Sequence, residues 1–169
     1  DSQLFAGMPP DVQLMVCARP APRGGQCLLS DTWPLLDHLR EVDSELYAHL
    51  FDQVRRIPFV FGDVVGPTVS LRGGRLVFTH SPMAPRDNIG ARLAPYLATT
   101  PRLERLLQGG DIMVVDNHRM LHGRRAFEGG QREFTRILVW LEREVGTHAV
   151  HRATASAAAT RTAAQAAGS

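Results

Sequence analysis

The pattern of apolar and polar positions predicts several short strands and fewer helices. Residues 12–18 are mostly apolar and bounded by prolines, which fits a buried strand, and residues 26–30 fit a second short strand. Between residues 57 and 80, Phe, Val, Ile and Thr are interrupted by Gly-containing turns, which predicts two or three antiparallel strands. Residues 111–116 and 132–141 fit two further strands.

Helical periodicity is confined to three segments, residues 31–40, 43–54 and 91–107, the last of them interrupted near Pro101. An irregular loop is expected over residues 81–90. Because strands and helices do not alternate regularly, a parallel βαβ fold fits the chain poorly. The sequence therefore predicts a mostly β fold, a sandwich or barrel with a few surface helices.

The composition changes near residue 146. The segment that follows is rich in Ala and Thr, and residues 153–169 contain no large apolar side chain. A segment with little apolar surface to bury does not offset the entropy lost on ordering. We therefore expect residues 1–146 to form the folded domain and residues 147–169 to be a disordered tail.

Charge and composition narrow the classes of function. The 169 residues carry 19 basic side chains, all of them Arg, against 17 acidic ones, and a net charge of +2 does not favour nucleic-acid binding. Apolar runs are far shorter than the roughly 20 residues that cross a membrane. Two cysteines are too few for a disulfide framework or a Cys-rich zinc site. No signal peptide is recognisable, so we expect a cytoplasmic protein, and its oligomeric state stays open.

One stretch of the chain concentrates side chains that carry chemistry. His118 and His122 follow a strand, and Arg132 and Arg136 open the next one. On a strand, Arg132, Phe134 and Arg136 face the same way. Guanidinium groups on an inward face are costly unless they meet anions, and Arg binds both oxygens of a carboxylate. With a His available as ligand, the pattern suggests a metal ion that holds a small carboxylate substrate.

Several short motifs occur together in this region, namely Gly110-Asp111, Asp116-Asn117, His122-Gly123-Arg124, and Phe127 followed by a later Arg. Upstream, Pro9-Pro10 precedes the first strand, and residues 24–31 read GGQCLLSD. Over roughly residues 1–144 the combination resembles the TauD/TfdA-like iron(II)/2-oxoglutarate dioxygenases. It is most similar to their clavaminate-synthase-like and γ-butyrobetaine-hydroxylase-like branch. The resemblance implies a double-stranded β-helix (jelly roll), of which residues 1–146 would be the distal part.

The same resemblance implies a set of site residues. His122 would be the distal histidine of a two-His-one-carboxylate iron(II) site, and Asp1 falls near the carboxylate position. The first histidine would then lie two residues before Asp1. Arg132 would bind the far carboxylate of 2-oxoglutarate and Arg136 the cosubstrate or a substrate carboxylate, although the short spacer after His122 allows these two roles to be exchanged. Cys27 stands where many relatives have a Thr that helps to bind 2-oxoglutarate.

The activity that the resemblance implies is hydroxylation, or another oxidation, of an unactivated C–H bond. The substrate would be a small polar molecule such as an amino acid or a natural-product intermediate, with dioxygen consumed and succinate and CO2 released. The alternative is a truncated or degenerate jelly-roll homologue that binds a ligand or partner without turnover, which is favoured if no His precedes Asp1. A cupin-like metalloenzyme that does not use 2-oxoglutarate is a third option.

Simpler roles are expected for the remaining polar residues. His118 and His80 are expected to pack or hydrogen-bond within the structure, and Asp116 and Asn117 to hold a turn. For residues 86–88, contact with substrate and capping of the following helix both stay open.

Overall fold

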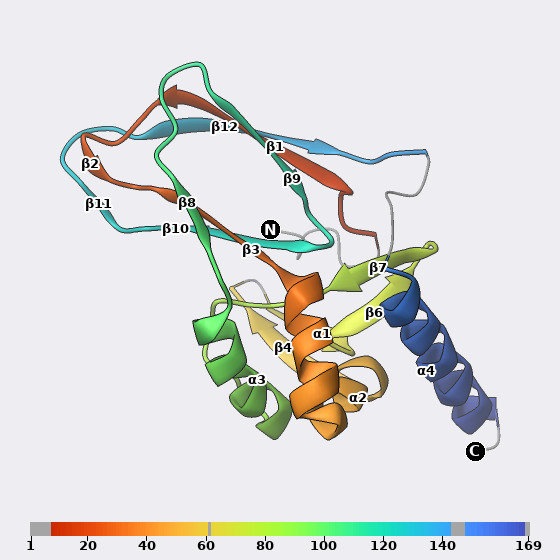
Figure 1. Ribbon diagram of the computed structural model, residues 1–169. Coiled ribbons are helices and arrows are strands. Elements are labelled where there is room, and N and C mark those ends of the chain that lie inside the picture. Colours follow the sequence, from red (N-terminus) through yellow and green to blue (C-terminus); the bar gives the residue numbers. More distant parts are fainter. Residues whose placement is uncertain (1–7, 61, 143–147, 168–169) are drawn as a thin grey trace.

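The strands form two antiparallel three-stranded sheets that lie at one end of the molecule (Figure 1). The computed structural model describes residues 8–60, 62–142 and 148–167. The first sheet has the order β12-β1-β9, formed by Glu133–Val139, Val12–Arg19 and Ile112–Asp116. The second has the order β10-β3-β8, formed by Met120–Arg124, Cys27–Asp31 and Leu103–Arg105. The expected mostly β fold with surface helices is confirmed.

Three two-stranded pairs complete the described strands. They are β2 with β11 (Arg23–Gly24 and Phe127–Glu128), β4 with β5 (Arg55–Phe59 and Gly62–Gly66), and β6 with β7 (Val69–Arg72 and Arg75–Phe78). The helices, α1 (Thr32–Val42), α2 (Ser44–Asp52), α3 (Asn88–Thr99) and α4 (Ala149–Ala167), lie at the other end of the molecule (Figure 1). In the part of the chain that the structure describes, no helix is both long and apolar enough to cross a membrane.

The main hydrophobic core lies between the helices and the β6-β7 hairpin, away from the two sheets. Its most deeply buried large side chains come from α1, α2, α3 and β6, and are Leu36, Leu39, Leu46, Leu50, Val69 and Leu93. This arrangement leaves the space between the two sheets free of the main core. That space is therefore available for polar side chains.

The structure corrects the prediction of a helix over residues 91–107. Helix α3 ends at Thr99, and Leu103–Arg105 instead forms β8, which pairs with β3. Pro101 explains the end of the helix, because proline lacks an N–H group and disfavours helical geometry in the residue before it. For residues 57–80 the sequence predicted two or three strands, whereas the structure has four strands there, in two hairpins.

The expectation of a disordered tail is also corrected, because residues 149–167 form helix α4. This helix packs against α2, β6 and β7, with His151, Ala155 and Ala158 buried. Alanine has the highest helix propensity, and its small side chain allows close approach to a neighbouring element. The large apolar groups that the segment lacks are supplied by its neighbours, including Tyr47 and Phe51 on α2.

Asp31 links the second sheet to the helices. Its side chain caps α1 by accepting a hydrogen bond from Trp33 N at 3.0 Å, and it pairs with Arg119, whose Nε lies 2.8 Å from Asp31 Oδ1. Burial raises the pKa of Asp31, but the hydrogen bonds from Arg119 and Trp33 outweigh burial and hold it below its ordinary 3.8. The Asp31 carboxylate therefore stabilises the folded state at every pH at which it is ionised.

Replacing Asp31 with Asn tests this charge, because Asn is also a good helix cap. We expect the free energy of unfolding to fall by about 1–2 kcal/mol at neutral pH. The folded-state pKa is the lower one, so the stabilisation is complete above the unfolded-state value and is lost as the pH falls through the folded-state value. The difference from the wild type should therefore shrink below about pH 4, as measured by urea unfolding across pH. Asp63→Asn is the control, since Asp63 pairs with an exposed Arg86. A difference for Asp31→Asn that persists at low pH would contradict the prediction.

Asp11 joins β1 to the turn after β9 and to the chain beyond β12. Its carboxylate is buried, pairs with Arg75 and accepts a hydrogen bond from Leu141 N at 2.8 Å. Its backbone O accepts from Asn117 N at 2.9 Å. We expect Asp11→Ala to lower the free energy of unfolding by about 3 kcal/mol, because the buried Arg75 charge loses its partner. Urea unfolding measures this, with Asp63→Ala expected to cost less than about 1 kcal/mol. Equal losses for the two variants would refute the assignment.

Candidate functional site

The inner face of the first sheet carries polar side chains. In the register of β1 with β12, Met15 lies opposite Arg136 and Cys17 lies opposite Phe134. Opposite residues of an antiparallel pair share a face, and so do alternate residues of one strand, so Gln13 lies on this face as well. Gln13 and Cys17 are almost completely buried, at 1% and 0% exposure, which marks this face as the inner one.

The second sheet, β10-β3-β8, lies across from the first (Figure 1). His122 on β10 lies opposite Leu29 on β3, and Cys27 lies two residues before Leu29 on the same face. The His122 Nε2 atom is 3.5 Å from Gln13 Nε2, so the inner faces of the two sheets meet at this point. His122 was expected in the connection that follows the strand over residues 111–116, whereas the structure places it within strand β10.

Arg132 lies just before β12 and reaches across to the second sheet. Its Nη2 is 3.8 Å from Cys27 Sγ, and its guanidinium carbon lies 3.6 Å from the centroid of the Phe134 ring. The Arg132 side chain also passes Gly25, where a Cβ would lie 3.6 Å from Arg132 Cδ. Among residues 8–60, 62–142 and 148–167, no carboxylate lies within ion-pair distance of Arg132. A half-buried guanidinium without a carboxylate is a candidate to bind an anionic ligand.

The structure therefore brings together four of the five residues expected at the site. His122, Cys27, Arg132 and Arg136 all lie on the facing sides of the two sheets. Burial lowers the pKa of the His122 ring, and the positive charge of Arg136 acts in the same direction, against a smaller opposing effect of the Met120 backbone. A neutral imidazole is the form that binds a metal ion. Asp1, the fifth residue, lies outside the described residues.

Gln13 is a polar residue of this region that the sequence did not single out. Its side chain is 1% exposed, and within the described residues its Oε1 has no hydrogen-bond partner. Buried amide oxygens in proteins nearly always have such a partner, so this oxygen is available to a bound group. The signal in the sequence is a single amide in an otherwise apolar strand.

The two cysteines lie on opposite sheets of the same interior, and both are free thiols. Burial raises the pKa of the Cys17 thiol, while the nearby Arg132 charge lowers it. The Cys17 Sγ is 3.6 Å from the carbonyl oxygen of Leu107.

Several simpler expectations are confirmed. His118 is buried, with Nε2 3.1 Å from Pro9 O, so it has a structural role. Asp116 holds the turn after β9 by accepting hydrogen bonds from His118 N and Arg119 N at 3.1 and 3.2 Å. Of the two roles that stayed open for residues 86–88, the structure shows helix capping for Asp87, whose side chain accepts a hydrogen bond from Gly90 N at 2.8 Å.

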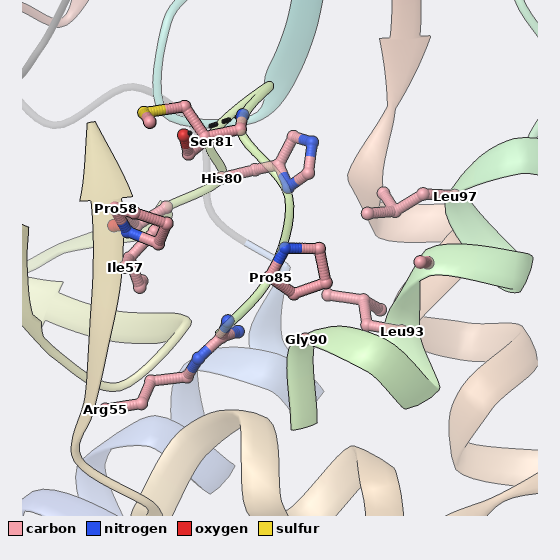
Figure 2. Close-up of a pocket in the computed structure, with 12 residues that line it drawn as sticks. Arg55, Ile57, Pro58, His80, Ser81, Pro85, Gly90, Leu93 and Leu97 are labelled. Carbon is pink, nitrogen blue, oxygen red and sulfur yellow. Dashed lines mark hydrogen bonds between the residues drawn. The ribbon is translucent and has the colours of Figure 1, made fainter. Parts of the chain in front are cut away.

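A separate pocket lies between β4, the loop after β7 and α3. Figure 2 shows Arg55, His80 and Pro85 among the side chains that line it. Its volume is about 50 Å³, which holds at most a few water molecules, whereas small-molecule sites usually enclose about 300 Å³ or more. Arg55 is already paired with Asp87, Nε to Oδ2, at 3.0 Å. The space between the two sheets is therefore the stronger candidate site.

Comparisons with known proteins point to the same part of the chain. Residues 97–138 match the model of the family described as "Taurine catabolism dioxygenase TauD, TfdA family". The matched range contains His122, Arg132 and Arg136, and it excludes Asp1 and Cys27. No curated protein matches the chain.

Several solved structures share the fold. An asparagine oxygenase in complex with Fe(II), 2S,3S-3-hydroxyasparagine and succinate matches with a TM-score of 0.62 and 21% identity, over 80% of this chain and 47% of its own. The non-heme iron oxygenase OrfP in complex with Fe and alpha-ketoglutaric acid has a TM-score of 0.56 and 21% identity, over 80% and 47%. AAD-2 in complex with Mn(II) and N-oxalylglycine has a TM-score of 0.61 and 17% identity, over 81% and 66%.

The chain thus spans about half the length of the first two of these structures. The likeness confirms the expected jelly-roll fold, and the family match falls on the strands that carry His122, Arg132 and Arg136. Over residues 97–138 the chain is therefore similar to the TauD/TfdA family, in the region where its motifs predict that resemblance.

Proposed function

We propose that this chain carries the distal part of an iron(II)- and 2-oxoglutarate-dependent dioxygenase that oxidises an unactivated C–H bond of a small polar substrate. The observation that carries the proposal is the Arg132 guanidinium. It is half-buried between the sheets, contacts Cys27 and has no carboxylate within ion-pair distance among the described residues. An arginine in this situation is suited to hold a dicarboxylate such as 2-oxoglutarate.

The metal site would use His122, with Asp1 as its candidate carboxylate ligand. The described part of this site fits a metal, because burial lowers the pKa of His122 and keeps its ring neutral. The neighbouring Gln13 Oε1, buried without a partner among the described residues, offers a hydrogen-bond acceptor beside that ring. When bound, iron(II) would supply the activation of dioxygen that couples C–H oxidation to conversion of 2-oxoglutarate to succinate and CO2.

Between the two arginines, Arg132 is the better candidate for the far carboxylate of the cosubstrate. It contacts Cys27, whose position in relatives is held by a Thr that helps to bind 2-oxoglutarate. Arg136 lies farther along β12, opposite Met15, and its charge acts on His122. We therefore assign Arg136 to the carboxylate of a substrate bound beside the proposed metal ligand His122. The side chains would position both acids, and the space between the sheets would limit access of water.

An amino acid is the substrate class that we favour. The structural neighbours include an asparagine oxygenase and OrfP in complex with (3S)-hydroxy-L-Arg. An amino acid carries the carboxylate that Arg136 would recognise. The other expected partner is dioxygen.

The test is formation of succinate from 2-oxoglutarate by the full protein, with iron(II) and a panel of free amino acids, followed by mass spectrometry of the products. Substrate-dependent succinate together with a product heavier by one oxygen atom would support the proposal. Binding of 2-oxoglutarate without succinate formation from any substrate would instead support the non-catalytic alternative.

A further inference from the structure

A second cluster of metal-binding side chains lies among the helices, apart from the two sheets. It consists of Asp37 on α1, His151 on α4, and His148 directly before α4. One ligand atom from each of the three lies within 4.8 Å of the others. The two histidines follow a His-X-X-His spacing, which places both on one side of the first turn of α4.

The distances in this cluster resemble those around a metal ion. His148 Nε2 lies 3.4 Å from Asp37 Oδ2, and His151 Nε2 lies 3.5 Å from Asp37 Oδ1. Two ligand atoms of a tetrahedral zinc ion, each about 2.0–2.1 Å from the metal, are about 3.3 Å apart. The Asp37 carboxylate thus already lies at this distance from both rings, and a rotation of the stacked rings would direct both nitrogens at one ion.

Burial sets this cluster apart from an ordinary surface group. His151 is 0% exposed, and its Nε2, which points to Asp37, makes no hydrogen bond of good geometry within the described residues, although the Trp33 backbone also interacts with this ring. Its other ring nitrogen, Nδ1, lies 2.9 Å from the Tyr47 hydroxyl, which in turn lies 3.2 Å from Thr154 Oγ1. Metal-bound histidines are usually oriented in this way, by a hydrogen bond to the nitrogen that does not bind the metal.

A salt bridge between imidazolium and carboxylate is the competing explanation. The rings of His148 and His151 stack with their centroids 4.1 Å apart and an interplanar angle of 22°. Two positive rings at this separation would repel each other, so at most one of them can be an imidazolium, and Arg40 Nη2 already lies 3.7 Å from Asp37 Oδ1. Two neutral rings that share a cation with the carboxylate avoid this repulsion.

We propose that Asp37, His148 and His151 bind a divalent transition-metal ion, Zn²⁺ in the first place, that fastens α4 to α1. Two nitrogens and one carboxylate oxygen form a donor set that suits zinc, and a water molecule completes the coordination. The Asp37 side chain is about two-fifths exposed, so solvent can reach the coordination position that the water would occupy. The role of the ion would be structural, since the chain after β12 would be anchored by it.

The test measures zinc bound by the full protein after equilibrium dialysis, in a His122→Ala background that removes the other candidate site. We expect about one zinc per chain in this background. Adding His148→Ala or Asp37→Asn should weaken binding by about 100-fold or more. Adding His38→Ala, an exposed histidine on α1, should leave it unchanged. Circular dichroism verifies that each variant is folded. If His148→Ala does not fold, Asp37→Asn is used as the test variant in its place.

A second readout concerns α4 itself. Zinc should slow amide hydrogen exchange in α4 of the His122→Ala protein and should have no such effect when His148 is also replaced. Zinc binding that survives both His148→Ala and Asp37→Asn would overturn the proposal. Bound zinc that leaves the exchange of α4 unchanged would overturn the anchoring role.

Discussion

His122→Ala is expected to abolish 2-oxoglutarate turnover by the full protein, lowering kcat/KM by roughly 1,000-fold or more. The physical reason is the loss of a metal ligand and with it several kcal/mol of metal-dependent stabilisation of the transition state. His122 is held within β10 by pairing with β3, and burial lowers its pKa, so that the neutral ring is available near pH 7. The measurement is succinate formation at saturating iron(II) and 2-oxoglutarate.

The matched control is His38→Ala, which removes an exposed histidine of α1 and should leave turnover unchanged. Urea unfolding should show that His122→Ala remains folded, since the β10-β3 pairing uses backbone groups. Turnover by His122→Ala within tenfold of the wild type would show that His122 is not an iron ligand. Loss of turnover by His38→Ala as well would indicate a general effect of substitution on the protein.

The strands of this fold were largely predictable because each has a strong local signal. Residues 12–18 and 111–116 are short apolar runs bounded by turn residues, and both became strands of the first sheet. Helices α1 and α2 begin at Thr32 and Ser44, directly after the capping residues Asp31 and Asp43, within one residue of the starts predicted for them. Helix α4 was not predictable from composition, because its stability depends on apolar groups of α2 and β6 that lie far away in sequence.

The candidate site was predictable only in part, for the same reason. The shared face of Arg132, Phe134 and Arg136 follows from strand periodicity, and the contact of the Arg132 guanidinium with the Phe134 ring agrees with it. The proximity of Gln13 to His122 and of Cys27 to Arg132 results from the packing of two sheets. No local pattern encodes such contacts, which are set by the overall topology.

Arg132→Ala is expected to raise the KM for 2-oxoglutarate by about 100-fold, with a smaller change in kcat. Hydrogen bonds to a charged group contribute about 1.5–3 kcal/mol each, and the substitution removes a fork that can form two of them. Arg132→Lys should recover part of the loss, because a lysine restores the charge and not the bidentate geometry. Steady-state kinetics with 2-oxoglutarate as the varied substrate measures the effect.

Arg136→Ala separates the roles of the two arginines and completes this prediction. If Arg136 holds the substrate, its loss should raise the KM for the amino acid and leave that for 2-oxoglutarate within a few-fold of the wild type. The reverse pattern would show that the roles are exchanged, as the short spacer after His122 allows.

Cys27→Thr gives an independent check, because a hydroxyl is a stronger hydrogen-bond donor than a thiol and Cys27 contacts Arg132. A lower KM for 2-oxoglutarate in Cys27→Thr would place the cosubstrate beside Arg132, whereas an unchanged KM would favour Arg136.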